Sequence, residues 1–155
     1  MKKRIESLHV PHALHGKNKP KSLWREDMFT FSVTTNKRTE FINITKDVQN
    51  AIDELNIKSG VISVFIPHTT AGITINENAD PDVMIDMESA LEKIVPWHAG
   101  YRHCEGNSAA HLKASMMGSS VQLIVENGSI QRGTWQGIYF SEFDGPRTRK
   151  VWVSK

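Results

Sequence analysis

Apolar side chains at alternate positions predict β-strands through most of the chain. Residues 28–35 place two phenylalanines and a valine on one face of a strand. Asn36-Lys37 then predicts a tight turn, so that residues 39–44 return as the partner strand. Similar apolar or β-branched segments predict five further strands, over residues 61–67, 71–76, 121–126, 135–143 and 147–153.

Apolar side chains three and four residues apart predict three helices. The first follows Thr45, which can cap it. The second begins at Asp80-Pro81, because Asp caps and Pro suits the first helical position, and it runs to about residue 95. Ser108 can cap a short third helix over residues 109–117. The order of elements predicts an α+β fold, a β-sandwich of mostly antiparallel strands with two main helices and one short helix.

Composition and charge narrow the class of protein. The chain has 155 residues and one cysteine, Cys104, and holds no apolar run long enough to span a membrane. We therefore expect a cytoplasmic protein with no membrane partner. Residues 1–27 form a basic N-terminal extension and residues 28–155 a single domain. The first 25 residues hold seven lysines and arginines against one acid, but the acidic body argues against nucleic-acid binding, and a solvated arm is the simpler interpretation.

Three histidines fall where polar groups cluster. His68 follows an apolar strand, His103 lies in the irregular polar loop 97–107, and His111 lies in the first turn of the short helix. Neutral imidazoles bind divalent transition metals, and three of them with an open position form a typical catalytic zinc site. They could equally act as hydrogen-bonding or acid–base groups, or be unrelated surface histidines, because their spacing matches no established zinc pattern.

Carboxylates and polar groups beside these histidines are further candidates. Glu77 and Glu105 could act as general bases, although a carboxylate such as Glu77 is also favoured at a helix start by the helix dipole. The helix start at Asn107-Ser108 offers backbone N–H groups to a phosphate, and Thr70 ends a neighbouring strand.

The C-terminal part of the chain adds candidates for phosphate and ring recognition. Arg147 and Arg149 would share one face of the last strand, where a guanidinium can match phosphate oxygens, or they form an ordinary charged face. Trp135 could stack on a flat ligand or belong to the core, and Gln136 lies beside it.

Three segments of the chain resemble the secondary thiamine-phosphate synthase, or YjbQ, family. They are His-Thr-Thr-Ala-Gly-Ile-Thr-Ile-Asn-Glu-Asn-Ala-Asp-Pro-Asp-Val (68–83), Tyr-Arg-His-Cys-Glu-Gly-Asn-Ser-Ala-Ala-His-Leu-Lys-Ala-Ser (101–115) and Gly-Thr-Trp-Gln-Gly-Ile-Tyr (133–139). The resemblance spans about residues 28–154. It implies a homotrimer with a polar cleft in which His68, His103 and His111 hold a divalent metal, with zinc as the expected ion.

The resemblance also implies a reaction, the joining of a pyrimidine diphosphate to a thiazole phosphate with release of pyrophosphate. On this hypothesis the protein is a metal-dependent enzyme acting on a small phosphorylated substrate. The metal would polarise phosphate oxygens or activate water, Arg147 and the Ser108 helix start would hold the phosphate, and Glu77 or Glu105 would be the base. Thr70, Asn107, Trp135 and Gln136 would complete the substrate site. The alternative is a non-catalytic trimer that binds a metal ion or a phosphorylated metabolite in the same cleft.

Overall fold

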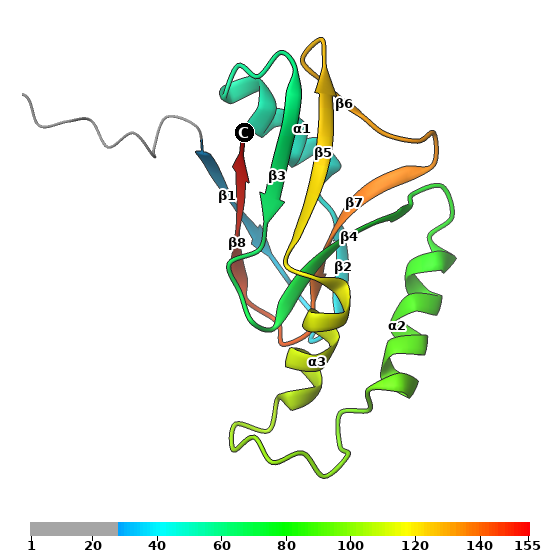
Figure 1. Ribbon diagram of the computed structural model, residues 1–155. Coiled ribbons are helices and arrows are strands. Elements are labelled where there is room, and N and C mark those ends of the chain that lie inside the picture. Colours follow the sequence, from blue (N-terminus) through cyan, green and yellow to red (C-terminus); the bar gives the residue numbers. More distant parts are fainter. Residues whose placement is uncertain (1–27) are drawn as a thin grey trace, which may run out of the picture.

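The protein is described by a computed structural model over residues 28–155, so the predicted basic extension lies outside the described residues. Strands and helices follow one another in the order that the sequence pattern predicts, with β6 as an additional strand (Figure 1). In chain order they are β1 (Met28–Thr34), β2 (Glu40–Asn43), α1 (Thr45–Glu54), β3 (Gly60–Phe65), β4 (Ala71–Glu77), α2 (Asp82–Ile94), α3 (Ser108–Met117), β5 (Ser120–Glu126), β6 (Ser129–Gln131), β7 (Gln136–Glu142) and β8 (Thr148–Ser154).

Two antiparallel sheets form a sandwich. The large sheet has the strand order β1-β8-β3-β5-β6, and the small sheet has the order β2-β7-β4. Inward-facing aliphatic side chains from both sheets make one core, with Ile62, Ile73 and Val153 fully buried. The predicted α+β class with mostly antiparallel pairing is confirmed.

The predicted hairpin between the first two strands is wrong. β1 pairs with β8, from Met28 opposite Ser154 to Thr34 opposite Thr148, whereas β2 pairs with β7 in the other sheet. The connection that contains Asn36-Lys37 therefore carries the chain from one sheet to the other. Alternation shows that a segment is a strand with one buried face, but it does not show which distant strand supplies the partner.

Helix α1 closes one end of the sandwich through the face predicted for it. Val48, Ala51 and Ile52 are buried in the main core. The predicted cap is different, because the Thr45 hydroxyl accepts a hydrogen bond from the Ile138 backbone N–H at 2.9 Å instead of capping its own helix. Thr45 thereby ties the helix start to β7.

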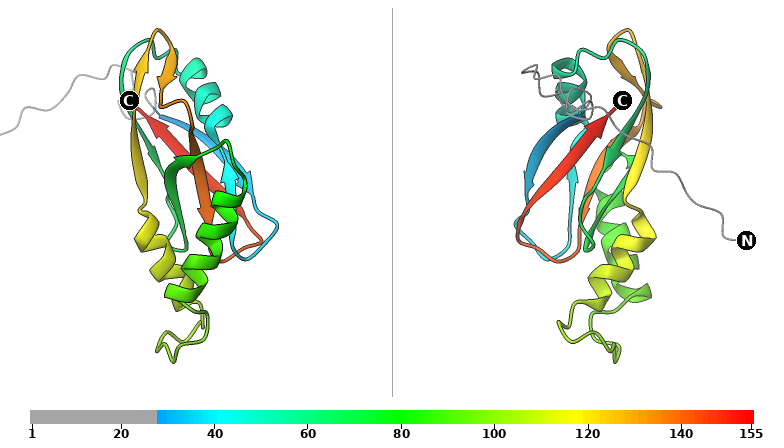
Figure 2. Two further views of the ribbon diagram at one scale, coloured as in Figure 1. Left: turned by 90° about the vertical axis from the view of Figure 1, so that its right-hand side faces the viewer. Right: turned by 60° about the vertical axis from the view of Figure 1, so that its left-hand side comes forward.

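Helices α2 and α3 lie beside the outer face of the small sheet and extend past its end, on the side of the molecule opposite α1 (Figures 1 and 2). α3 packs closely on β4, since a Cβ added to Gly72 would come within 2.9 Å of Met117. α2 is held less closely: Leu91 is its buried residue, and the apolar Ile94 at its C-terminal end is 64% exposed. Within residues 28–155 no helix is both long and apolar enough to cross a membrane.

Asn127-Gly128, the strongest hairpin signal in the sequence, does form a hairpin turn. Both residues have positive φ, 52° and 76°, as a two-residue hairpin of this type requires. The turn joins β5 to β6, a three-residue strand that the hydrophobic pattern does not predict.

Candidate functional site

His68 lies just beyond β3 and bonds to the backbone of β8. Its Nε2 accepts a hydrogen bond from the Lys150 backbone N–H at 2.8 Å. Burial lowers the pKa of His68 below its ordinary value of 6.5, and the nearby Arg149 charge lowers it further. His68 is therefore a neutral imidazole at pH 7.

The imidazole rings of His103 and His111 contact each other. Their rings lie edge to face with centroids 5.3 Å apart. His103 comes from the loop between α2 and α3, and His111 lies one turn into α3. The Glu105 carboxylate lies 3.7 Å from His103 Nε2, close enough to orient the ring.

Two cavities meet at His111. One, of about 460 Å³, is lined by His68 and His111 together with Thr69, Ser115 and Ser119. The other, of about 450 Å³, is lined by His103 and His111, with further residues Tyr101, Arg102, Ser108 and Leu112. The structure thus brings all three predicted histidines to one region, because His111 lines both cavities and each of the other two histidines lines one of them. We call the two cavities together the His111 cleft.

The expected three-histidine metal site does not fit this geometry. Among residues 28–155 no group of three or more His, Cys, Asp or Glu side chains is placed to hold a metal ion. His68 has its accepting nitrogen already engaged by Lys150, and the edge-to-face contact joins only His103 and His111. His103, His111 and the exposed Glu105 would supply the three protein ligands of a catalytic zinc site, but among the described residues they are not placed to hold one ion together.

A buried ion pair behind His68 escaped the sequence analysis. Arg149 donates two hydrogen bonds to Glu142, from Nε at 2.8 Å and from an Nη at 2.6 Å, and both residues are buried. The same guanidinium donates to the Thr70 hydroxyl at 2.8 Å, and Thr35 donates to Glu142 at 3.1 Å. Thr70, expected at the substrate, therefore has its hydroxyl inside this network.

The carboxyl group of Glu142 is charged within that network. Burial alone would raise its pKa, but the hydrogen bonds and charge of Arg149 hold the pKa below the ordinary value of 4.5. The backbone N–H groups of Phe143 and Asp144 also donate to its Oε1. A sequence signal does exist: Glu142 follows Ile138 and Phe140 on the inward face of β7, and Arg149 precedes Val151 on the inward face of β8.

Arg147 does not share an exposed strand face with Arg149. It precedes β8 and bonds to Asp144, with Nε donating to the backbone carbonyl at 2.7 Å and an Nη donating to the carboxylate. The same carboxylate accepts from Asn107 Nδ2 at 3.1 Å. Arg147 is therefore tied to the start of α3 through Asp144. Asn107, and not Ser108 as predicted, is the N-cap residue, and its side chain makes no capping bond.

Glu77, Trp135 and Gln136 lie at the opposite end of the small sheet. Glu77 is paired with Gln136, whereas Ala71, which lines the His68 cavity, is paired with Glu142. Ala71 and Glu77 are six residue steps apart along β4, a distance of about 20 Å at roughly 3.3 Å per residue. Within one chain these three residues therefore cannot contact a ligand at the His111 cleft.

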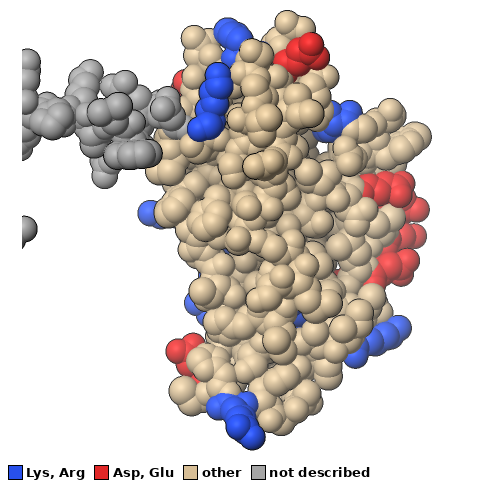
Figure 3. Space-filling view, viewed as in Figure 1, with Lys and Arg blue, Asp and Glu red and all other residues tan. Residues whose placement is uncertain are grey.

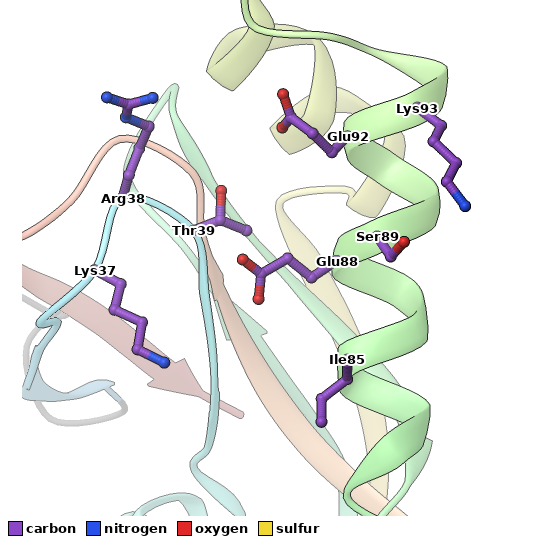
Figure 4. Close-up of a pocket in the computed structure, with 8 residues that line it drawn as sticks. All are labelled: Lys37, Arg38, Thr39, Ile85, Glu88, Ser89, Glu92 and Lys93. Carbon is purple, nitrogen blue, oxygen red and sulfur yellow. The ribbon is translucent and has the colours of Figure 1, made fainter.

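A third cavity, of about 710 Å³, lies between the β1–β2 connection and α2. Glu88 and Glu92 point from α2 toward the segment that holds Arg38 and Thr39, and Lys93 points away (Figure 4). Glu92 accepts a short hydrogen bond from the buried Lys113 of α3, which lowers the pKa of Glu92. None of the predicted site residues lines this cavity.

Comparison with known proteins places the fold in a family. Residues 29–155 match the sequence profile of the UPF0047 protein YjbQ-like family. The chain is 54% identical to the UPF0047 protein YugU of Bacillus subtilis, over 80% of this chain and 95% of that protein. It is 48% identical to a UPF0047 protein of Methanocaldococcus jannaschii, over 81% and 91% of the two chains.

Solved structures agree with this match. The crystal structure of a YjbQ/UPF0047 protein from Clostridium acetobutylicum, described as uncharacterized, is 57% identical, covers 81% of this chain and 98% of its own, and has a TM-score of 0.79. A Sulfolobus solfataricus protein described as being of unknown function is 31% identical, covers 81% and 93%, and has a TM-score of 0.77. None of these descriptions names a reaction or a metal. The chain belongs to the YjbQ-like UPF0047 family.

Proposed function

We propose that this protein is an enzyme that acts on a small phosphorylated molecule in the His111 cleft. The supporting observation is that His111 lines both cavities, so a ligand in either one, or across both, contacts the same imidazole. Each cavity is within the size range of small-molecule sites. His103 and Glu105 lie within reach of the second cavity and supply acid–base groups.

The phosphate would lie at the start of α3. Backbone N–H groups at a helix N-terminus favour anions, and Ser108 and Arg102 line the cavity beside it. Asn107 bears on the rest of the ligand and not on the phosphate, because its Oδ1 is a buried acceptor without a hydrogen-bond partner among the described residues. A buried acceptor of this kind calls for a donor such as a ligand hydroxyl, an amine or a water molecule.

Thiamine-phosphate synthesis is the named candidate reaction. The thiazole nitrogen would use its lone pair to form a C–N bond to the pyrimidine methylene carbon, while the C–O bond to the diphosphate breaks and pyrophosphate leaves with that electron pair. His103 and His111 would donate hydrogen bonds to the leaving diphosphate, and Glu105, 3.7 Å from His103 Nε2, would orient the His103 ring. No step in this proposal uses a metal, because residues 28–155 do not assemble the expected three-histidine set.

Product formation tests the enzyme proposal. Purified full-length protein is given the pyrimidine diphosphate and the thiazole phosphate, and thiamine phosphate and pyrophosphate are measured. His111→Ala should lower the rate by about 10²–10⁴-fold, the usual share of a positioned acid–base group. His98→Ala is the matched control, because His98 is exposed and lines neither cavity. Equal rates in the wild type and His111→Ala would refute the role of His111.

A non-catalytic binding protein is the second candidate. The observation in its favour is the exposure of the acid–base groups: His103 is 41% and Glu105 69% exposed, whereas catalysis usually excludes water from such groups. Saturable binding of either precursor with no product would favour this candidate. The same His111→Ala variant would then weaken binding without any rate to change.

We also propose that the protein is a homotrimer. The outer face of the large sheet exposes Val61, Phe65, Ile124 and Trp152, and the rings of Phe65 and Trp152 stack with centroids 5.6 Å apart. Few charged side chains interrupt the centre of the face seen in Figure 3, while acidic side chains gather on the side where α2 lies. A contiguous apolar patch on a sheet is typical of a surface covered by another chain.

A further inference from the structure

The end of β3 leaves a backbone donor on β8 without a strand partner. β3 pairs with β8 as far as Phe65 opposite Trp152. Beyond this point the chain leaves the sheet, because Ile66 N–H donates to Ser119 at 2.8 Å and Pro67 has no N–H. The Lys150 N–H is then satisfied by a side chain, His68 Nε2, at 2.8 Å. The ring takes the place that a strand carbonyl would have filled.

This bond fixes the proton on the ring. A neutral imidazole has one donor nitrogen and one acceptor nitrogen, so acceptance at Nε2 places the proton on Nδ1. Protonation of Nε2 would set two donors against each other. The surrounding groups agree: burial and the charges of Arg149 and Arg147 lower the pKa of His68, and only the Glu142 charge among the nearby carboxylates raises it. His111, from α3, faces the same cavity.

The cavity beside His68 is rich in donors. Its polar lining consists of the two imidazoles and the hydroxyls of Thr69, Ser119 and Ser115, and Ser115 donates its proton to the His111 backbone carbonyl at 2.9 Å. No carboxylate lines the cavity within the described residues. Such a lining suits an oxygen that accepts hydrogen bonds more than it suits a cation. A metal at Nε2 would in addition displace the Lys150 N–H from its side-chain partner. Histidines that bind metals show the reverse arrangement, in which the second nitrogen donates to an acceptor.

We propose that His68 is a hydrogen-bond donor, through Nδ1–H, to an oxyanion oxygen of the ligand in this cavity, and that it is not a metal ligand. The oxyanion is a phosphate or carboxylate group, and the identification of the ligand as phosphorylated rests on the proposed function. His68 then determines specificity, because it donates a hydrogen bond to a ligand oxygen at one end of the cleft. His103 and His111 contact the ligand at the other end.

Nitrogen NMR of full-length protein labelled with ¹⁵N-histidine tests the tautomer. The His68 signals are assigned by their absence in His68→Gln, whose amide oxygen can still accept from Lys150. We expect the pattern of an Nδ1–H neutral ring at pH 7. An Nε2–H pattern would overturn the proposal. Addition of one equivalent of zinc chloride should leave the His68 nitrogens unshifted, and a metal-bound pattern at His68 would equally overturn it.

Titration with inorganic phosphate tests the ligand. We expect the His68 Nδ1 signal to shift on saturation, and phosphate to bind His68→Gln about tenfold more weakly, because one hydrogen bond to a charged group is lost. Shifts at His111 without any at His68, or equal affinity of the two proteins, would overturn the oxyanion role alone. Absence of shifts at both histidines would overturn the proposed function as well. Sodium acetate in place of phosphate distinguishes a carboxylate site from a phosphate site.

Discussion

Removal of the charge on Glu142 should be the most destabilising of the conservative substitutions in this protein. Glu142→Gln keeps the shape of the side chain but leaves the buried Arg149 guanidinium without a counter-charge. Glu142 accepts five hydrogen bonds, at Oε1 from Arg149 and two backbone N–H groups and at Oε2 from Arg149 and Thr35. Glutamine places an NH₂ at one of these two positions, so that donors face donors.

The expected loss follows from this geometry. Breaking a buried pair by removing one charge costs about 3–5 kcal/mol, which is a large part of the roughly 5–15 kcal/mol that stabilises an ordinary domain. Arg147→Ala is the control, because it breaks the pair with Asp144, in which Arg147 is half exposed. Exposed pairs contribute about 0.2–1 kcal/mol. The ratio of the stability losses in Glu142→Gln and Arg147→Ala therefore reports how much burial strengthens an ion pair, because each substitution removes one charge.

Urea unfolding followed by circular dichroism at pH 7 supplies the measurement. All variants are compared at one protein concentration, because the stability of an oligomer depends on it. A loss below about 1 kcal/mol in Glu142→Gln, equal to that in Arg147→Ala, would refute the argument that Glu142 and Arg149 form a buried, fully hydrogen-bonded pair.

Three further outcomes follow from the same contacts. The pKa of Glu142 is lowered in the folded protein, so the stability that the Glu142 charge contributes is present above the ordinary value of 4.5 and is lost as the pH falls through the lowered folded pKa. In urea unfolding from pH 7 to pH 3, the free energies of unfolding of the wild type and Glu142→Gln should therefore converge at the acid end. A difference that stays constant with pH would contradict this. Glu92→Gln should destabilise less than Glu142→Gln, because Glu92 is 54% exposed although its partner Lys113 is buried, and an equal loss in urea would mean that water does not screen this pair. Ile124→Lys should convert a trimer to monomers in light-scattering chromatography, because it places a charge in the exposed apolar patch, and an unchanged mass would show that copies do not meet at this face.

Local sequence patterns predicted most helices and strands of this fold, but they did not predict which strands pair with distant segments of the chain. The positive φ values at Asn127-Gly128 follow from the two residue types alone, so this hairpin could be predicted. The exchange of sheets between β1 and β2 could not, because it depends on β7 and β8, which lie about a hundred residues further along. Thr45 shows the same limit, because its hydroxyl accepts a hydrogen bond from the distant Ile138 N–H and does not cap its own helix.

The candidate site was predicted in part for the same reason. Short polar segments located the three histidines, and the fold brought them to one region because α3 lies beside the end of β4. Glu77 was grouped with them because it lies only nine residues after His68 in sequence. An extended strand turns that short separation into a long distance, and Glu77 faces Gln136 instead.

The role of the buried charges could have been inferred from alternation. Glu142 and Arg149 each occupy an inward position among aliphatic residues, and opposite charges on the buried faces of two strands predict an ion pair. The tautomer of His68 had no such signal, because it depends on where β3 stops relative to Lys150.

The predicted zinc ion has a direct test that also separates the roles of the histidines. Elemental analysis of protein purified without added metal should give the same zinc content for the wild type and His68→Gln, because the geometry assigns His68 to hydrogen bonding. A lower zinc content in His68→Gln than in the wild type would restore the three-histidine site.

Binding of a phosphorylated ligand tests the account most directly. Isothermal titration calorimetry of thiazole phosphate into full-length protein should show saturable binding to the wild type and to His98→Ala. Binding to His111→Ala should be at least about tenfold weaker, because both cavities lose the imidazole that they share. Equal affinity of all three proteins, or no binding to any of them, would contradict the assignment of the His111 cleft as the functional site.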